Sequence, residues 1–328
     1  MKAFDYAAPT TLEDAVKLLG GPGSVALSGG TDLISRMKDY VTSPERVVYL
    51  KDVKSLAGIS GDAAAGFTIG AGARLAEIAA NRALAEAYPA LHQATVEIGS
   101  VQIRNMATLG GNLLQRPRCW YFRAGNGLLA MKDGKSLVKA GDNRFHAIFM
   151  TDGDALFVSP SSLAVALAAL GATVTVAGPK AERTFKIEEL YQAPKRPDES
   201  EHTITHGEIL TKVTIPGGAG KNASYEARHK QAQDWPLVLA SVNLGLNGET
   251  VSSARIFVYG VAPIPWKSTT AEAEIVGKRI TLETAAAAGE AAAKGSAPLS
   301  MNAYKVSLLK TVVKRAILAA VGNRYWEV

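Results

Sequence analysis

The chain has 328 residues, of which 47% are hydrophobic and 20% are charged. These proportions are ordinary for a folded protein and exclude a disordered chain, and the length predicts two or three domains. The net charge of +6 is spread along the sequence without a dense basic stripe, so we expect no nucleic-acid partner.

The sequence also bears on where the protein works. Residues 1–6 contain no apolar signal core, and no apolar run is long enough to span a bilayer. Cys119 is the only cysteine, which excludes an internal disulfide framework. We therefore expect a cytoplasmic protein with no membrane partner.

Strand and helix patterns alternate through the N-terminal third of the chain. Thr11 is a hydroxyl cap for the first helix, and Gly20 and Gly21 end it. Such alternation is typical of a layered α/β or α+β domain. The expected strands lie at residues 25–27, 46–50 and 66–70, a turn at 58–61, and the expected helices at 12–19, 32–40, 74–80 and 89–98.

Residues 115–154 are irregular, polar and rich in Gly and Lys, which is typical of a functional loop. The Gly-rich stretch at residues 216–220 marks the best domain boundary in the sequence. Regular patterns predict helices at 163–170, 281–293 and 302–320, and strands at 173–176, 209–215, 237–246 and 254–261.

Two glycine pairs are the strongest candidates for a binding site. The first lies in Ser28-Gly29-Gly30-Thr31-Asp32-Leu33, and the second follows about eighty residues later in Thr108-Leu109-Gly110-Gly111-Asn112-Leu113. Because Gly-Gly leaves backbone N–H groups unhindered, two such loops can close around a pyrophosphate. The alternative for either loop alone is a left-handed turn.

Three other patterns imitate known sites. In Gly70-Ala71-Gly72-Ala73-Arg74-Leu75 a leucine stands where a dinucleotide fingerprint needs Gly or Ala, so we expect a turn. Gly134-Lys135-Ser136 lacks the leading glycine of a phosphate loop. His202 and His206 are separated by residues that favour a strand or loop, so a solvated loop is expected there in preference to a zinc site.

The two glycine loops, the run Ile103-Arg104-Asn105-Met106 before the second one, and the later Asp234-Trp235-Pro236 resemble the FAD-binding medium subunit of molybdenum hydroxylases, the xanthine dehydrogenase and aldehyde oxidoreductase family. The resemblance spans nearly the whole chain. It implies an α+β fold, with a two-lobed FAD-binding domain of the vanillyl-alcohol oxidase (PCMH) type followed by a small C-terminal α+β domain. The implied domains are 1–218, with lobes of about 1–55 and 56–218, and 221–328.

The resemblance implies an oxidoreductase subunit that works by electron transfer. Its FAD would pass electrons from an iron–sulfur partner to an external acceptor. A large partner would carry the molybdenum cofactor and a small one the two-iron clusters, and a dimer of such heterotrimers is one assembly that this allows. Two alternatives stay open: a stand-alone flavin oxidoreductase with its own small substrate, and a scaffold subunit that has lost FAD.

The resemblance also assigns residues to the cofactor. Backbone N–H groups of the two loops would hold the pyrophosphate and ribityl chain, and Leu210 would pack near the flavin ring. Ser162 stands where the family often has an aspartate, so we expect weaker FAD binding or help from Asp152 or Asp154. No catalytic or metal-binding residue is expected, and the cofactor-binding residues are Leu27, Ser28, Gly29, Gly30, Thr31, Asp32, Leu33, Thr108, Gly110, Gly111, Asn112, Ser162 and Leu210.

Residues 113–123 look most like the branch of the family whose flavin subunit carries an extra four-iron cluster. Such a cluster usually takes four thiolates, and Cys119 is the only one available. We therefore predict that the loop is kept without an iron–sulfur cluster, and that Cys119 is a partly buried structural thiol. The basic, aromatic residues 116–123 are expected near the FAD or the iron–sulfur partner, with an ordinary solvated loop as the alternative.

Overall fold

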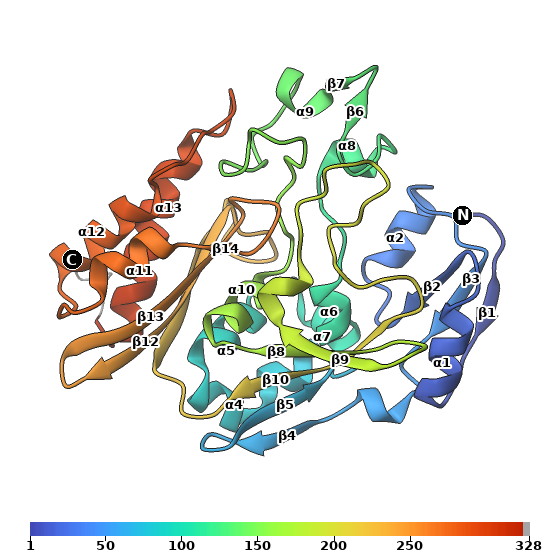
Figure 1. Cartoon of the computed structure of the whole chain (residues 1–328), viewed down its shortest axis with the longest axis horizontal. Helices are drawn as coiled ribbons and strands as arrows, with labels where there is room; N and C mark the ends of the chain where they lie inside the picture. The colour runs from blue at the N-terminus through green and yellow to red at the C-terminus, as the bar shows by residue number, and fades with distance from the viewer. Residues whose placement is uncertain (324–328) are drawn as a thin grey trace.

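The computed structural model describes residues 1–323. Figure 1 shows a small N-terminal sheet at one side, a larger central sheet with helices, and a C-terminal sheet covered by helices at the other side. Strands and helices alternate in the N-terminal sheet, whereas the central and C-terminal sheets are antiparallel and carry packed helices, which is the α+β class that the resemblance implies.

The N-terminal sheet is parallel, with the order β1-β3-β2. Its first helix begins after Thr11, whose hydroxyl accepts a hydrogen bond from the Asp14 N–H at 3.2 Å. The expected strands and helices of this region are confirmed, and β1 is an addition. The elements are β1 (Asp5–Ala7), α1 (Leu12–Leu19), β2 (Ser24–Leu27), α2 (Leu33–Lys38), β3 (Arg46–Tyr49) and the 3-10 helix η1 (Lys54–Leu56).

The central sheet is antiparallel, with the order β4-β5-β10-β8-β9. The turn expected at residues 58–61 is wrong, because this segment pairs with β5 as a strand and the chain reverses after Asp62, whose carboxylate accepts from two N–H groups at 2.8 Å. The elements are β4 (Ile59–Asp62), β5 (Gly66–Gly70), α3 (Leu75–Ala80), α4 (Arg82–Ala87), α5 (Pro89–Val96), α6 (Val101–Met106), α7 (Leu109–Leu113), α10 (Ser162–Ala169), β8 (Thr173–Ala177), β9 (Glu182–Lys186), η2 (Ile187–Leu190) and β10 (Ile209–Pro216).

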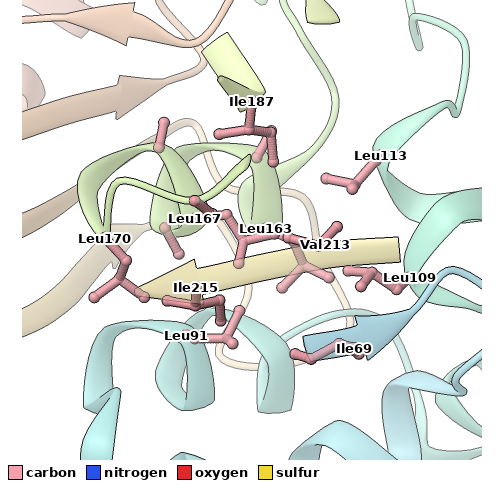
Figure 2. Packing of buried hydrophobic residues seen from close by; sticks show 14 of the residues in the cluster. Ile69, Leu91, Leu109, Leu113, Leu163, Leu167, Leu170, Ile187, Val213 and Ile215 are labelled. Atoms are coloured by element: carbon pink, nitrogen blue, oxygen red, sulfur yellow. The ribbon is translucent and has the colours of Figure 1, made fainter. Parts of the chain in front are cut away.

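Helix α10 lies at the centre of the core, and every one of its residues is buried. A helix that is apolar on all sides belongs in an interior, and each buried leucine contributes roughly 1.5–3 kcal/mol. Figure 2 shows the leucines of α10 gathered with Val213 and Ile215 of β10 and Leu91 of α5 in one cluster. Leu109 and Leu113 of α7 belong to the same cluster, so the core fixes the second glycine pair in place.

The C-terminal sheet is antiparallel, with the order β11-β12-β13-β14. Helix α13 packs on β11 and β12, and α11 and α12 complete the helical layer (Figure 1). The two long strands and the two helices predicted here are confirmed. The elements are β11 (Lys221–Ala227), β12 (Val238–Asn247), β13 (Thr250–Tyr259), β14 (Trp266–Lys267), α11 (Thr269–Ile275), α12 (Leu282–Ala292) and α13 (Tyr304–Ala320).

Residues 114–161 run between the N-terminal sheet and the C-terminal helices, at the top of Figure 1. Gly134 and Lys135 belong to a two-stranded hairpin, so the segment Gly134-Lys135-Ser136 does not form a phosphate-binding loop. The short elements of this segment are α8 (Trp120–Arg123), β6 (Met131–Lys132), β7 (Lys135–Ser136) and α9 (Leu137–Ala140). Nowhere in residues 1–323 does a helix combine the length and the apolar character needed to traverse a bilayer.

Candidate functional site

The first glycine loop leaves the end of β2 and needs glycine at both positions. Gly30 has a φ of 74°, in the left-handed region, and a Cβ on Gly29 would lie 2.2 Å from the Met106 carbonyl oxygen. The loop therefore packs its backbone directly against the end of α6.

The same loop presents unused hydrogen-bond donors. Within the described residues 1–323, no group accepts a hydrogen bond from the backbone N–H of Gly29, Gly30, Thr31 or Asp32. Backbone N–H groups almost always find an acceptor, and consecutive N–H groups of this kind form an anion-binding concavity. The loop is therefore suited to an anion such as a pyrophosphate.

The second glycine pair differs from the expected loop. Gly110 and Gly111 lie inside the short helix α7, where the Gly110 N–H donates to the Ala71 carbonyl at 2.8 Å and the Gly111 N–H to the Thr108 hydroxyl at 3.2 Å. Neither a left-handed turn nor a pair of free donors is present here. Gly110 allows a close approach to Ala71, because a Cβ on Gly110 would lie 3.0 Å from the Ala71 Cβ, and both glycines line the first chamber.

A hydrogen bond joins the two glycine loops. The Thr108 hydroxyl donates to the Ser28 hydroxyl at 2.9 Å, although the two residues are 80 positions apart. Thr108 also caps α7, so one side chain sets both the start of this helix and the position of the first loop.

The loops line a partly open cavity, which we call the first chamber. Leu210 of β10 is buried at its wall, beside a register shift in the sheet. The predicted residues that line it are Leu27, Ser28, Gly29, Gly30, Thr31, Asp32, Leu33, Thr108, Gly110, Gly111 and Leu210.

Asn112 and Ser162 line a neighbouring cavity of about 950 Å³, the second chamber. The two chambers share Thr31, Gly111 and Gln115 and therefore adjoin, and we call them together the glycine-loop cleft. Every predicted cofactor-binding residue lines it.

Ser162 is the first residue of α10, and the described residues give its hydroxyl no hydrogen-bond partner. Its neighbour Ser161 caps the helix and donates to Asn112 at 2.7 Å. The suggested substitutes Asp152 and Asp154 are exposed and line neither chamber. Their segment is held instead against the C-terminal domain, where the Thr151 hydroxyl donates to the Ala297 carbonyl at 2.9 Å.

The carboxylate of Asp32 is engaged by arginines, and only the backbone of this residue is free for a ligand. It forms ion pairs with Arg36 at 3.1 Å, Arg118 at 3.0 Å and Arg123 at 2.7 Å, and its side chain is 11% exposed. Burial alone would raise the pKa of Asp32, but Arg118 and Arg123 outweigh it and hold that pKa below its ordinary value.

These contacts place residues 116–123 at the cleft. The guanidinium of Arg118 lines the second chamber and lies over the ring of Trp235, with its central carbon 4.8 Å from the ring centroid. This cation–π contact joins the N-terminal domain to the segment that precedes β12.

Sequence reasoning missed some lining residues of the first chamber. The pattern at residues 70–75 is a turn, as expected, but Ala71 and Gly72 border this cavity, as do Ile204 and Glu208. Gly72 lies close to the backbone of Leu56, where a Cβ would approach the Leu56 carbonyl oxygen to 3.0 Å, and the sequence gives no sign of this contact. Only the folded chain brings these residues beside the glycine loops.

The histidine pair does not form a zinc site. His202 is buried beside Tyr191, with ring centroids 5.5 Å apart, so the expected solvated loop is wrong for this residue, whereas His206 is exposed. Throughout residues 1–323, no group of three or more His, Cys, Asp and Glu side chains is placed to hold a metal ion. Cys119 lies with its Sγ 3.2 Å from His146 Nε2, and burial raises the pKa of its thiol.

Comparison with known protein families decides the identity of this fold. Residues 2–218 match the family described as the FAD binding domain in molybdopterin dehydrogenase. The chain belongs to this family. Residues 223–320 match the CO dehydrogenase flavoprotein C-terminal domain. The chain therefore contains both domains, one after the other.

Relatives of this FAD-binding chain match it along its full length. The aldehyde oxidoreductase FAD-binding subunit PaoB of Escherichia coli is 28% identical over 98% of this chain and 99% of its own. The carbon monoxide dehydrogenase medium chain of Hydrogenophaga pseudoflava is 26% identical over 97% and 96%. Among solved structures, quinoline 2-oxidoreductase from Pseudomonas putida 86 superposes with a TM-score of 0.77 at 25% identity and covers 99% of this chain and 100% of its own.

Proposed function

We propose that this chain is the FAD-binding electron-transfer subunit of a multi-subunit molybdenum hydroxylase. The observation that carries the proposal is the glycine-loop cleft, in which the unused N–H groups of the first loop line the same cavity as Gly110 and Gly111, and the Thr108–Ser28 hydrogen bond joins the two loops. The family membership of residues 2–218 gives the ligand its identity as FAD.

In this proposal each part of the cleft has a separate task. The N–H groups of residues 29–32 donate to the pyrophosphate, and Gly110 and Gly111 allow it to lie close to α7. Asn112 and Ser162 supply polar groups in the second chamber, and Leu210 offers an apolar wall for the flavin ring. When bound, FAD supplies reversible redox chemistry, and the protein positions it.

The partners follow from the relatives, whose names describe FAD subunits and medium chains. We propose a large subunit with the molybdenum cofactor and a small subunit with two-iron clusters, in an assembly that can double to a dimer of heterotrimers. The domain division at 1–218 and 221–328, with lobes of 1–55 and 56–218, is part of this proposal. So is a cytoplasmic location, which fractionation of the source cells tests.

The test combines purification of the complex with a substitution in the first loop. We expect flavin absorption with one FAD for each copy of this chain. Gly29→Ala forces a Cβ onto the Met106 carbonyl and should remove most of the bound FAD, whereas Gly153→Ala, in an exposed position with room for a Cβ, should retain it. Full FAD content in the Gly29→Ala protein would contradict the assigned site.

Two further readouts separate this proposal from its alternatives. Isolated chains whose flavin bleaches on addition of a small substrate would indicate a stand-alone oxidoreductase. Chains that stay colourless after reconstitution with FAD would indicate a scaffold. Iron analysis tests the predicted absence of a cluster, because four iron atoms per chain would contradict it.

A further inference from the structure

Two cavities meet at the side chain of Glu226, which lies near the end of β11. Glu226 lines the second chamber of the glycine-loop cleft, and it also lines a further cavity that we call the polar cavity. Glu97, at the end of α5, lines both cavities as well. These two carboxyl side chains therefore lie in the wall between the cleft and the polar cavity.

The polar cavity connects this wall with solvent. It is partly open, and the polar side chains of Gln93, Ser224 and Arg228 line it together with the two glutamates. The side chain of Glu97 is 42% exposed, whereas that of Glu226 is 13% exposed. Glu97 is thus accessible to solvent, and Glu226 lies deeper between the two cavities.

Arg228 is shared unequally between the two carboxyl groups. Its Nη2 donates a hydrogen bond to the Glu97 carboxylate. Its Nη1 lies 3.1 Å from Glu226 Oε1, but within residues 1–323 neither of these two atoms makes a hydrogen bond. The buried carboxyl group of Glu226 is therefore the less well compensated of the two.

The groups around Glu226 bring its titration into the neutral range. Burial raises the pKa of Glu226 to about 7, Arg228 lowers this pKa, and Glu97 raises it further. On β13, burial raises the pKa of the Tyr259 hydroxyl, Arg118 lowers it and Glu226 raises it, so this tyrosine stays neutral. A carboxyl group with a pKa near 7 can take up or release a proton at neutral pH.

The other carboxyl groups of the second chamber are committed elsewhere. The Asp234 carboxylate accepts from the N–H groups of Lys230 and Trp235 at 3.2 and 2.9 Å. Glu97 is held by Arg228 and faces solvent. Among the residues that the structure describes, Glu226 is thus the carboxyl group of this chamber that is free to change its protonation.

We propose that Glu226 takes up a proton through the polar cavity when FAD bound in the glycine-loop cleft is reduced. The inference rests on the proposed function, because FAD is the group whose charge changes. Two electrons from the iron–sulfur partner and one proton leave FAD with one additional negative charge. That charge favours the protonated carboxyl of Glu226, which gains one proton from water on reduction and returns it on oxidation.

The test measures the midpoint potential of FAD against pH in the full chain loaded with FAD, with dithionite as the electron donor. From about pH 7 to 8, the slope should show up to one proton more per FAD in the wild type than in Glu226→Gln, which keeps the shape but cannot titrate. Glu188→Gln is the matched control. Glu188 also pairs with an arginine, Arg255, but lies outside both cavities, so its variant should keep the wild-type slope.

Difference infrared spectra of the wild type provide a second readout that needs no variant. At about pH 8, reduction should produce the band of a protonated carboxyl group, and isotope-labelled glutamate should shift that band. Equal slopes in the wild type and in Glu226→Gln, or the absence of this band, would overturn the inference while bound FAD still supports the proposed function. A chain that binds no FAD would overturn both, so the FAD content distinguishes the two failures.

Discussion

The carboxylate of Asp32 lies among three guanidinium groups at the edge of the cleft. Its partners Arg118 and Arg123 belong to a segment that starts 84 residues later in the chain, where the Arg116 N–H donates to the same carboxylate at 3.1 Å. One buried negative charge therefore fixes a loop to the first glycine loop.

Asp32→Asn should lower the free energy of unfolding by about 3 kcal/mol, because it keeps the shape but leaves buried guanidinium groups without a counter-charge. Urea denaturation at pH 7 measures this difference. Asp142→Asn is the control, since its ion pair with Arg144 is half exposed and contributes little. Equal losses of unfolding free energy in the two variants would show that Asp32 stabilises the fold no more than an exposed ion pair does.

The depressed pKa of Asp32 predicts a dependence on acid. Since its pKa is lower in the folded protein than in the unfolded chain, this group adds stability above the unfolded pKa of about 3.9. That contribution disappears as the pH falls through the folded pKa. The difference between wild type and Asp32→Asn should thus be constant from pH 5 to 7 and shrink below about pH 4; a difference that persists in acid contradicts it.

At the scale of the element, the short helix α7 decides the shape of the cleft. Gly110 and Gly111 in the middle of its sequence have low helix propensity, so the sequence alone suggested a loop. Leu109 and Leu113 are both fully buried, and their packing imposes the helix against that preference. Strand β4 was missed in the same way, because only pairing with β5 makes its polar residues a strand.

The position of the glycine residues was nevertheless predictable. A Gly-Gly pair after the strand expected at residues 25–27 predicts unhindered N–H groups, whereas the close approach of Gly29 to the Met106 carbonyl was not predicted. The free N–H groups of this loop were anticipated. The occupied N–H groups of Gly110 and Gly111 were not, because their partners Ala71 and Thr108 are set by tertiary contacts.

Thr108→Val should loosen α7 and the first loop together, since the variant keeps the shape of the side chain and removes its hydroxyl. It loses the cap on Gly111 and the hydrogen bond to Ser28. We expect FAD affinity to fall about tenfold, measured by fluorescence titration of the apo-protein. Thr108→Ser keeps the hydroxyl and should restore the affinity, so a serine variant as weak as the valine variant would refute this role.

At the scale of the whole molecule, the C-terminal domain holds the long segment of residues 114–161 in place. Asn302 donates to the His146 and Ala147 carbonyls at 3.1 and 3.0 Å, and the Ile148 N–H donates to the Val261 carbonyl at 2.8 Å. The sequence marked residues 115–154 as functional but gave no sign of this attachment, because the partners lie more than a hundred positions away. The two domains therefore shape one set of adjoining cavities.

Lys305 is the strongest of these attachments, since it is 1% exposed and its ammonium serves three carbonyls. Lys305→Met retains the buried stem but leaves the Phe145, His146 and Gly260 carbonyls without a donor, which should cost about 3 kcal/mol of unfolding free energy. It should also make residues 124–145 more sensitive to limited proteolysis, because the anchor of that segment is gone. Lys310→Met, which removes a half-exposed ion pair with Glu290, should change neither property. Wild-type proteolysis rates in the Lys305→Met protein would show that the other contacts suffice to hold the segment against the C-terminal domain.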